Sequence, residues 1–242
     1  MPGSPIRCFL TARDSGHRLT EGPELPFADD GSGLPTVIVN TSRTFQQILG
    51  FGGAFTEASA LNWLALGAER RRELLAAYFD PAQGHGYSLC RVHMGSCDFA
   101  LGNYAHVEAA GDTALASFSI DRDRQALLPF IRAAQEAAGA PLKLLASPWS
   151  PPAWMKTSGR MNDGGSLRPE CRRAWARCYA RFIEAYAEEG VTIWGVSVQN
   201  EPMATQRWDS CLYTAEEERD FVRDHLGPEL EAAGLGHVKI VI

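Results

Sequence analysis

The chain has 242 residues, 45% of them hydrophobic, which is enough to bury a sizeable core as one or two domains. Its formal net charge of −6 gives no electrostatic footprint for nucleic acid or anionic membranes. The sequence has no window apolar enough for a membrane span, and its first residues lack the apolar segment of a signal peptide. We therefore expect a soluble protein, cytoplasmic rather than secreted, with no nucleic-acid partner and no integral membrane segment.

Motifs for metals and nucleotides are missing from the sequence. The six cysteines, at positions 8, 90, 97, 171, 178 and 211, include no C-x-x-C pair, and no H-E-x-x-H occurs. The stretch GFGGAF lacks the spacing of a dinucleotide fingerprint, and no P-loop is present. We expect no metal and no cofactor, and we interpret the cysteines as buried free thiols.

The first 45 residues differ in composition from the rest of the chain. They are rich in Gly, Pro and Asp and contain one short β-like run, at 36–39. This pattern predicts an extended, β-rich arm over residues 1–45, which precedes a main domain over residues 46–242.

In the main domain, strand-like and helical segments alternate. Apolar runs bounded by turn residues predict a strand and turn within 46–55 and four further strands, at 87–94, 142–146, 191–198 and 238–242. Apolar residues at helical spacing predict helices between them, up to residue 80, over 124–138, over 169–190 and from 214 onward. This α/β order implies a parallel sheet with right-handed crossovers. A doubly wound sheet and part of a (β/α)8 barrel both fit, and periodicity alone does not choose between them.

Polar and aromatic side chains gather where three of these strands end. The second strand runs toward Arg91 and Asp98, the third ends before Trp149, and the fourth ends in Asn200 and Glu201. Barrel enzymes place their active sites at this carboxyl-terminal end of the sheet. Any one polar strand ending is common in parallel sheets, but three in succession favour a site.

The residue types at these strand ends suit sugar hydrolysis. A glycosidase needs a carboxylic acid that protonates the departing oxygen and a second carboxylate that attacks the sugar or activates water. Aromatic rings stack on the apolar faces of sugars, and Arg, Asp and Asn bind hydroxyl groups. The fourth strand, which ends in Gln-Asn-Glu-Pro, is then interpreted as presenting Glu201 rather than as an ordinary strand exit with a turn proline.

Five segments resemble glycoside hydrolase family 30, which includes glucosylceramidases and β-1,6-glucanases. They are GFGGAFTEASA (50–60), YSLCRVHMGSCDFA (87–100), ASPWSPPAWMKTSG (146–159), GVSVQNEPMATQRWDSC (195–211) and TAEEERDFVRDHLGP (214–228). The resemblance implies an incomplete (β/α)8 TIM barrel of about four βα units plus a fifth strand, with the N-terminal β-rich arm contributing to a side β-domain. It also implies retaining hydrolysis of β-glucosides, and leaves open whether the substrate is glucosylceramide, another glycolipid or a β-1,6-glucan.

The resemblance assigns roles to individual residues. It makes Glu201 the general acid/base, and Arg91, Asp98, Trp149 and Asn200 substrate-binding residues. The nucleophile of the family is a second glutamate after the seventh strand, whereas this sequence ends in the fifth. Asp98 is a disfavoured substitute, because the resemblance gives it to substrate hydroxyls. We expect a fragment or truncated product that is inactive as it stands, and the alternative is a non-catalytic sugar-binding or regulatory protein.

Four other conspicuous residues receive structural interpretations. We expect Glu57 to begin a helix, where its charge suits the helix dipole. We expect His93 to form part of a pocket wall, and Trp63 and Trp175 to lie in the core because they fall on apolar helical stripes.

Overall fold

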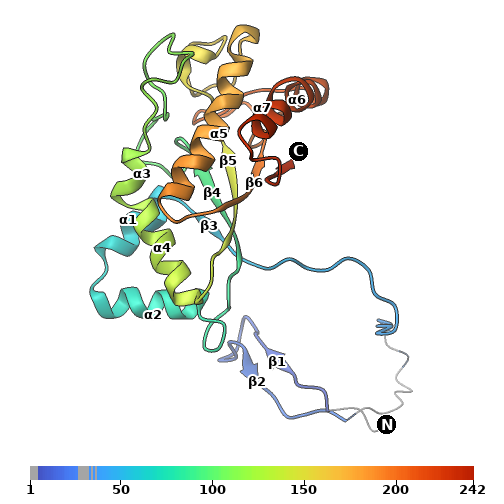
Figure 1. The fold of residues 1–242 in the computed structure, drawn as a ribbon. Coiled ribbons are helices and arrows are strands. Elements are labelled where there is room, and N and C mark those ends of the chain that lie inside the picture. The colour runs from blue at the N-terminus through green and yellow to red at the C-terminus, as the bar shows by residue number, and fades with distance from the viewer. Residues whose placement is uncertain (1–4, 27–32, 34, 36) are drawn as a thin grey trace. The chain divides into compact units, whose positions relative to one another are not determined.

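The computed structural model describes residues 5–26, 33, 35 and 37–242, which form two compact units, Met1–Gln47 and Ile48–Ile242 (Figure 1). In the first unit, β1 (Phe9–Leu10) and β2 (Thr20–Glu21) form an antiparallel pair. Of the β-like run predicted at 36–39, residue 36 lies outside the described residues, and 37–39 are exposed and form no strand. That prediction is wrong for its described part.

The second unit is built on a five-stranded parallel sheet. Its strands are β3 (Ala54–Phe55), β4 (Leu89–Met94), β5 (Lys143–Pro148), β6 (Ile193–Ser197) and β7 (Lys239–Val241). They lie side by side in chain order, β3-β4-β5-β6-β7. This order excludes a doubly wound sheet, in which the strand order reverses. Among the described residues β3 and β7 do not pair with each other, so the sheet is an open stretch of barrel rather than a closed one.

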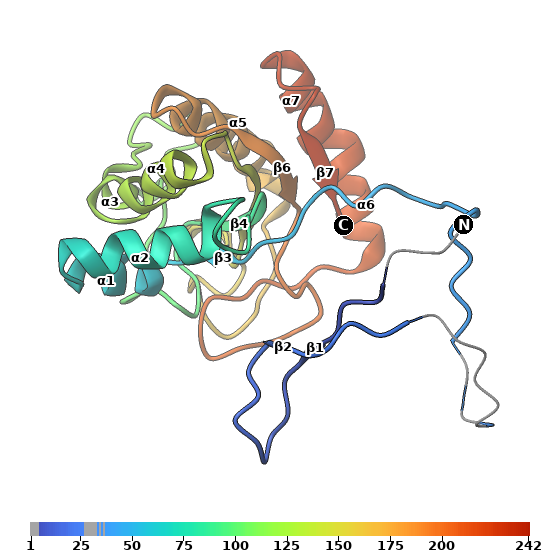
Figure 2. The same ribbon diagram turned by 90° about the horizontal axis from the view of Figure 1, so that it is seen from below.

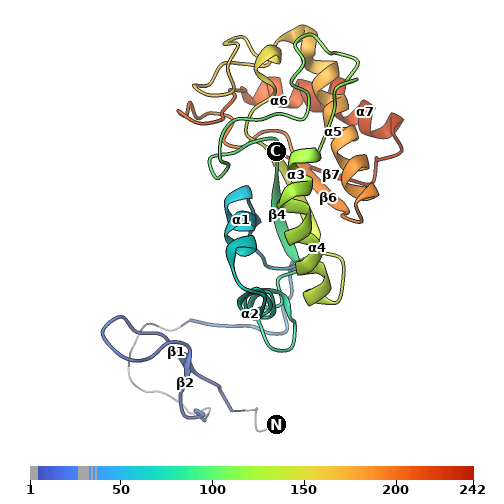
Figure 3. The same cartoon turned by 90° about the vertical axis from the view of Figure 1, so that its left-hand side faces the viewer.

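Helices connect the strands and pack against one face of the sheet (Figures 2 and 3). They are α1 (Glu57–Ala65), α2 (Ala68–Phe79), α3 (Asp121–Gln125), α4 (Leu127–Ala138), α5 (Arg172–Glu188), α6 (Ala215–Phe221) and α7 (Gly227–Ala232). Short 3₁₀ turns form at Ala153–Met155 and Pro169–Cys171, and a π-helical turn at Val222–Leu226 joins α6 to α7. Among the described residues, no helix has the length and apolar character needed to cross a membrane.

The predicted helices form, but two of them are interrupted near a proline. The helix expected over 124–138 breaks at Ala126, because Pro129 lacks an N–H and is tolerated only in the first turn of α4. The helix expected from residue 214 widens into a π turn just before Pro228, which cannot donate the usual i→i−4 bond. Gly139 ends α4 in the left-handed conformation with φ of 66°, as its position predicts.

The two faces of the sheet differ in chemistry. Strand side chains alternate between faces, and those that face the helices are apolar. The core on that side includes Cys90, Val92, Met94, Leu144 and Ala146 from the strands, and Trp63, Leu128, Ile131, Trp175, Phe182 and Ile183 from the helices. Trp63 and Trp175 are buried there, as expected, and five of the six free cysteines are buried while Cys8 is exposed. The opposite face carries Arg91 and Ser147, and its carboxyl-terminal end holds the candidate site.

Candidate active site

Arg91 of β4 brings three strand ends together. Its Nε donates a hydrogen bond to Ser147 Oγ of β5 at 2.9 Å, and its Nη2 donates to Asn200 Oδ1 after β6 at 2.8 Å. Its guanidinium carbon also lies 4.6 Å from the centre of the Trp149 ring, a cation–π contact. Three of the five predicted site residues, Arg91, Trp149 and Asn200, are therefore in direct contact.

The chain that leaves β6 is fixed by hydrogen bonds to its neighbours. The Asn200 N–H donates to Pro148 O at 2.9 Å, and Gln199 Nε2 donates to Trp149 O at 2.7 Å. The buried Tyr179 hydroxyl of α5 donates to Val198 O at 2.6 Å. These bonds tie the end of β6 to the end of β5 and to the helix layer, so the backbone that carries Asn200 has little freedom.

Glu201 occupies an unusual backbone conformation at the end of this fixed segment. Its φ of 47° lies in the left-handed region, which few residues other than glycine adopt. Such outliers persist only where the surroundings hold them, and they concentrate at functional sites. The Glu201 side chain is exposed, with Gln206 Nε2 3.5 Å from its Oε2. The strand exit thus holds the backbone of Glu201 and presents its carboxylate to solvent.

Asp98 lies on the loop that follows β4 and is also exposed. Within the described residues it forms no hydrogen bond or ion pair, and it interacts with Arg91 through the charge of its carboxylate. Burial lowers the pKa of Arg91, and the nearby Cys97 side chain and the carboxylates of Asp98 and Glu201 oppose that shift. Both exposed carboxylates therefore act on the same guanidinium.

His93 and Glu57 lie beneath the site and have structural roles. His93 is 2% exposed, accepts a hydrogen bond from the Glu57 N–H at Nε2 (3.1 Å), and pairs through Nδ1 with Gly95 O (2.6 Å). This arrangement requires a neutral ring with its proton on Nδ1, and burial lowers the His93 pKa in agreement with it. Glu57 begins α1, as predicted. Because both side chains are held in buried contacts, we assign neither of them as a proton carrier at the site.

Sequence reasoning assigned no role to the two serines that support Arg91. Ser147 accepts from Arg91 and is itself 2.7 Å from the Ser197 hydroxyl of β6. A signal was available, because Ser147 and Ser197 occupy the ends of two neighbouring predicted strands. It was weak, because hydroxyl residues are common at strand ends for many reasons.

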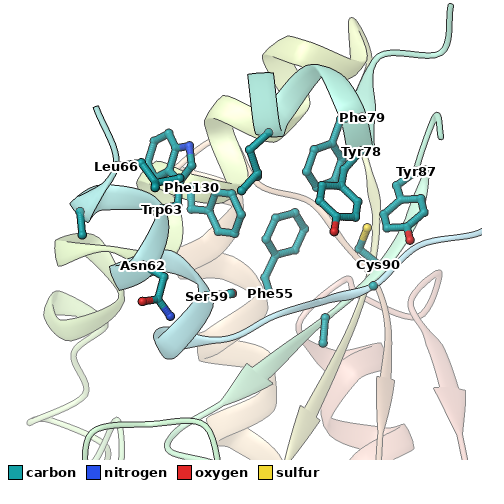
Figure 4. A pocket seen from close by; sticks show the side chains of 14 residues that line it. Phe55, Ser59, Asn62, Trp63, Leu66, Tyr78, Phe79, Tyr87, Cys90 and Phe130 are labelled. Carbon is teal, nitrogen blue, oxygen red and sulfur yellow. The ribbon is translucent and has the colours of Figure 1, made fainter. Parts of the chain in front are cut away.

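A large cavity among the described residues does not coincide with the residues around Arg91. It has a volume of about 650 Å³ and lies between β3, α1, α2 and α4, on the helix side of the sheet (Figure 4). Six of the 14 residues that line it are aromatic: Phe55, Trp63, Tyr78, Phe79, Tyr87 and Phe130. A smaller hollow of about 340 Å³ contains Arg91, Leu145 and Trp194. None of the residues that line the larger cavity has a carboxylate side chain, so the candidate site is the cluster of polar residues around Arg91.

Comparisons with known proteins show which family this chain resembles. Residues 48–242 match the glycosyl hydrolase family 30 TIM-barrel domain. The lysosomal acid glucosylceramidase of Mus musculus is 39% identical over 209 residues, which are 83% of this chain and 40% of that protein. The putative glucosylceramidase 3 of Caenorhabditis elegans is 38% identical over 203 residues, 81% of this chain and 39% of that protein.

Solved structures show the same fold. The crystal structure of SrfJ from Salmonella typhimurium superposes with a TM-score of 0.85 at 40% identity, over 93% of this chain and 50% of that chain. The endo-β1,6-glucanase BT3312 gives a TM-score of 0.80 at 29% identity, over 93% and 49%. The chain thus spans half or less of the length of these relatives. It belongs to glycosyl hydrolase family 30.

Proposed function

We propose that this chain carries the acid/base half of a retaining β-glucosidase site. Glu201 is the general acid/base, and Arg91, Asp98, Trp149 and Asn200 bind the sugar. The observation that carries the proposal is the contact of Arg91 with both Trp149 and Asn200, beside the exposed carboxylate of Glu201.

The hydrogen bond from Arg91 prepares Asn200 for a sugar hydroxyl. A guanidinium can only donate, so the Asn200 oxygen faces Arg91 and its amide nitrogen is left to donate to substrate. A donor next to the acid/base suits the sugar 2-hydroxyl, a contact that strengthens in the transition state. Trp149 has one ring face against Arg91 and is half-buried, so its other face can stack on a sugar ring.

The reaction needs a second carboxylate about 5–5.5 Å from the first. In the first step Glu201 protonates the glycosidic oxygen while that second carboxylate attacks the anomeric carbon. In the second step Glu201 removes a proton from the water that releases the sugar. We assign Asp98 to substrate hydroxyls, and we propose that the nucleophile belongs to a carboxyl-terminal half of the barrel, outside these residues.

Two features of the fold support an incomplete barrel. The outer edges of β3 and β7 lack a partner strand among the described residues, and unpaired parallel edges favour pairing with further chain. The aromatic cavity next to β3 has the position and composition of a surface that a further strand and helix would cover. Both features fit the chain's coverage of half or less of its relatives.

We infer β-glucosides as the substrate class, because relatives matched by the chain include glucosylceramidases and endo-1,6-β-glucanases. The glucosylceramidase relative is 39% identical to this chain and the endo-β1,6-glucanase BT3312 is 29% identical, which favours a glucosylceramidase-like specificity. The second candidate function is sugar binding without turnover, which the single assigned catalytic carboxylate favours for the chain on its own.

The test compares the chain alone with the chain joined to the carboxyl-terminal half of the endo-β1,6-glucanase BT3312. We expect the hybrid, but not the chain alone, to hydrolyse 4-nitrophenyl β-D-glucoside or β-1,6-glucan. The chain alone should still bind the iminosugar 1-deoxynojirimycin, and Trp149→Ala should remove that binding. Turnover by the chain alone that Glu201→Ala abolishes would place the nucleophile within these residues. Absence of binding together with an inactive hybrid would overturn the proposed site.

A further inference from the structure

The three loops that carry the candidate site are joined to one another by polar side chains, of which Ser96, Lys156 and Asp209 are buried. These loops follow β4 (95–103), β5 (149–168) and β6 (199–213), and they carry Asp98, Trp149 and Glu201 in turn. Asp209 joins the last loop to the first. Its carboxylate is 4% exposed and accepts hydrogen bonds from Ser96 Oγ at 2.5 Å and from Asn103 Nδ2 at 3.0 Å.

Lys156 joins the second loop to the third. Its side chain is fully buried, and Nζ donates to Met161 O at 2.9 Å and to Ser210 O at 2.5 Å. The backbone extends this connection, because Leu212 N–H donates to Gly165 O at 2.8 Å. Lys156 thus reaches from the loop that begins with Trp149 to the residue next to Asp209.

A third contact completes the connection between all three loops. Asn103 Nδ2 also donates to Asn162 Oδ1 at 2.6 Å, which links the loop after β4 to the loop after β5. Each of the three loops is therefore bonded to both of the others. We call Ser96, Asn103, Lys156, Asn162 and Asp209 the loop junction.

We propose that Lys156 and Asp209 are positioning residues that hold Asp98, Trp149 and Glu201 in one fixed arrangement. The inference rests on the proposed glycosidase site. None of the loop-junction side chains is assigned to substrate, so each acts on the sugar through the backbone of a loop.

The chemistry of the junction favours this role over simple packing. Burying an ammonium group costs more than burying an apolar chain of similar length. The cost is offset here by two carbonyl acceptors and by the nearby carboxylate of Asp209. A methionine would fill the same space, but it could not fix Met161 O and Ser210 O relative to each other.

Lys156 also has a titration that reports on the junction. Burial lowers its pKa to about 8, while the charges of Cys211, Asp209 and Asp163 oppose the shift and Arg160 adds to it. The chain has only three lysines, Lys143, Lys156 and Lys239, so the ¹³Cε signals of a lysine-labelled sample can be assigned by substitution. Asp209→Asn keeps an acceptor oxygen for Ser96 but removes the charge, and should therefore move the Lys156 titration to lower pH.

The decisive experiment compares Lys156→Met with Lys143→Met in the 242-residue chain. Lys143 is exposed at the start of β5, so its replacement removes the same charge away from the loops. We expect Lys156→Met to shift the indole ¹H–¹⁵N signal of Trp149, speed amide exchange at Asn200 and Leu212, and weaken the Kd for 1-deoxynojirimycin about 10- to 100-fold. Lys143→Met should leave all three unchanged.

Several outcomes would overturn the proposal. A folded Lys156→Met chain with wild-type exchange and an unmoved Trp149 signal would show that the junction only fills space. If Lys156→Met does not fold, Asp209→Asn decides in its place, and wild-type exchange and iminosugar affinity in that variant would count against the proposal. If the wild-type chain binds no iminosugar, the proposed function fails, while the Trp149 signal and the amide exchange still decide whether the junction positions the loops.

Discussion

Arg91 and Asn200 are 109 residues apart in the sequence, and a hydrogen bond of 2.8 Å from Arg91 Nη2 to Asn200 Oδ1 joins them. The bond connects the ends of β4 and β6 across β5, whose Ser147 accepts from the same guanidinium. Three consecutive parallel strands are therefore locked in register at the end where the site lies. The contact also turns the Asn200 amide group so that its nitrogen is directed away from Arg91.

Replacing Arg91 by lysine tests directly the pair of hydrogen bonds that Arg91 donates to Ser147 and Asn200. A lysine keeps the charge but cannot bond Ser147 and Asn200 together while it lies over Trp149. We expect Arg91→Lys to weaken 1-deoxynojirimycin binding by about 1.4–2.8 kcal/mol, roughly 10- to 100-fold in Kd. Isothermal titration calorimetry measures it, with Arg70→Lys on the exposed side of α2 as the control. Unchanged affinity in Arg91→Lys would show that charge alone suffices.

The ion pair of Glu57 and Arg122 should make stability depend on acidic pH. Arg122 donates to both Glu57 oxygens, at 2.8 and 3.1 Å, and Leu101 N–H donates at 2.7 Å. Burial alone would raise the Glu57 pKa, but these bonds outweigh it and the pKa lies below its ordinary 4.5. The unfolded chain then binds the proton more tightly, so this stabilisation is fully present above pH 4.5 and is lost as the pH falls through the folded pKa.

We therefore expect Glu57→Gln to destabilise the chain by about 1–3 kcal/mol at neutral pH, and by less as the pH falls below the ordinary value for glutamate. Urea unfolding of Glu57→Gln and the unchanged chain, at neutral pH and below pH 4.5, measures the difference in the free energy of unfolding. Glu73→Gln removes an exposed ion pair with Arg70 and should cost less than about 1 kcal/mol. A pH-independent effect of Glu57→Gln would contradict the assigned ionisation.

A buried carboxylate away from the site should matter more for stability. Asp123 is 1% exposed and accepts hydrogen bonds from Tyr104 Oη (2.9 Å) and Tyr186 Oη (2.8 Å), with His106 Nε2 3.1 Å away. Asp123→Ala leaves these groups buried without their partner, which should cost about 3–5 kcal/mol. Thermal unfolding compares this loss with that of Asp121→Ala, which removes an exposed pair with Arg124 and should destabilise the chain far less. Similar losses in both variants would show that the buried network is not stabilising.

Much of the fold could be predicted because its signals are local. The apolar stripe of α5 is visible in the sequence and is buried from Trp175 to Tyr186. The Thr214 and Glu217 pair forms the capping box that its spacing predicts. Of the strand and turn predicted within 46–55, the strand is confined to Ala54–Phe55. A Cβ at Gly52 would collide with the carbonyl oxygen of Leu89. The backbone at Gly52 therefore packs closely against the backbone of Leu89, which a strand with larger side chains could not do.

The candidate site was harder to predict, because the residues that contact one another there are far apart in the sequence. Arg91, Trp149 and Asn200 follow strand ends and could be grouped once the sheet was expected to be parallel. Lys156 and Asp209 lie in irregular loops, and their hydrogen bonds to Ser210 and Ser96 join residues 54 and 113 positions apart. Neither periodicity nor turn chemistry specifies such contacts. The roles of the five predicted site residues stay predictions until they are tested in an enzyme.

The last prediction concerns Glu201 in the completed hybrid enzyme. Glu201→Gln keeps the size of the side chain but removes the proton donor, so glucosides with poor leaving groups should lose about 10²- to 10⁴-fold in kcat/KM. A dinitrophenyl glucoside departs with little protonation and should lose far less in the glycosylation step. Azide, which needs no general base, should restore turnover of the dinitrophenyl substrate if the covalent intermediate accumulates. Glu216→Gln, an exposed change in the first turn of α6, is the control for loss of one charge. Equal losses on both substrates, without rescue by azide, would show that Glu201 is not the acid/base and that the left-handed turn at this position serves the fold alone.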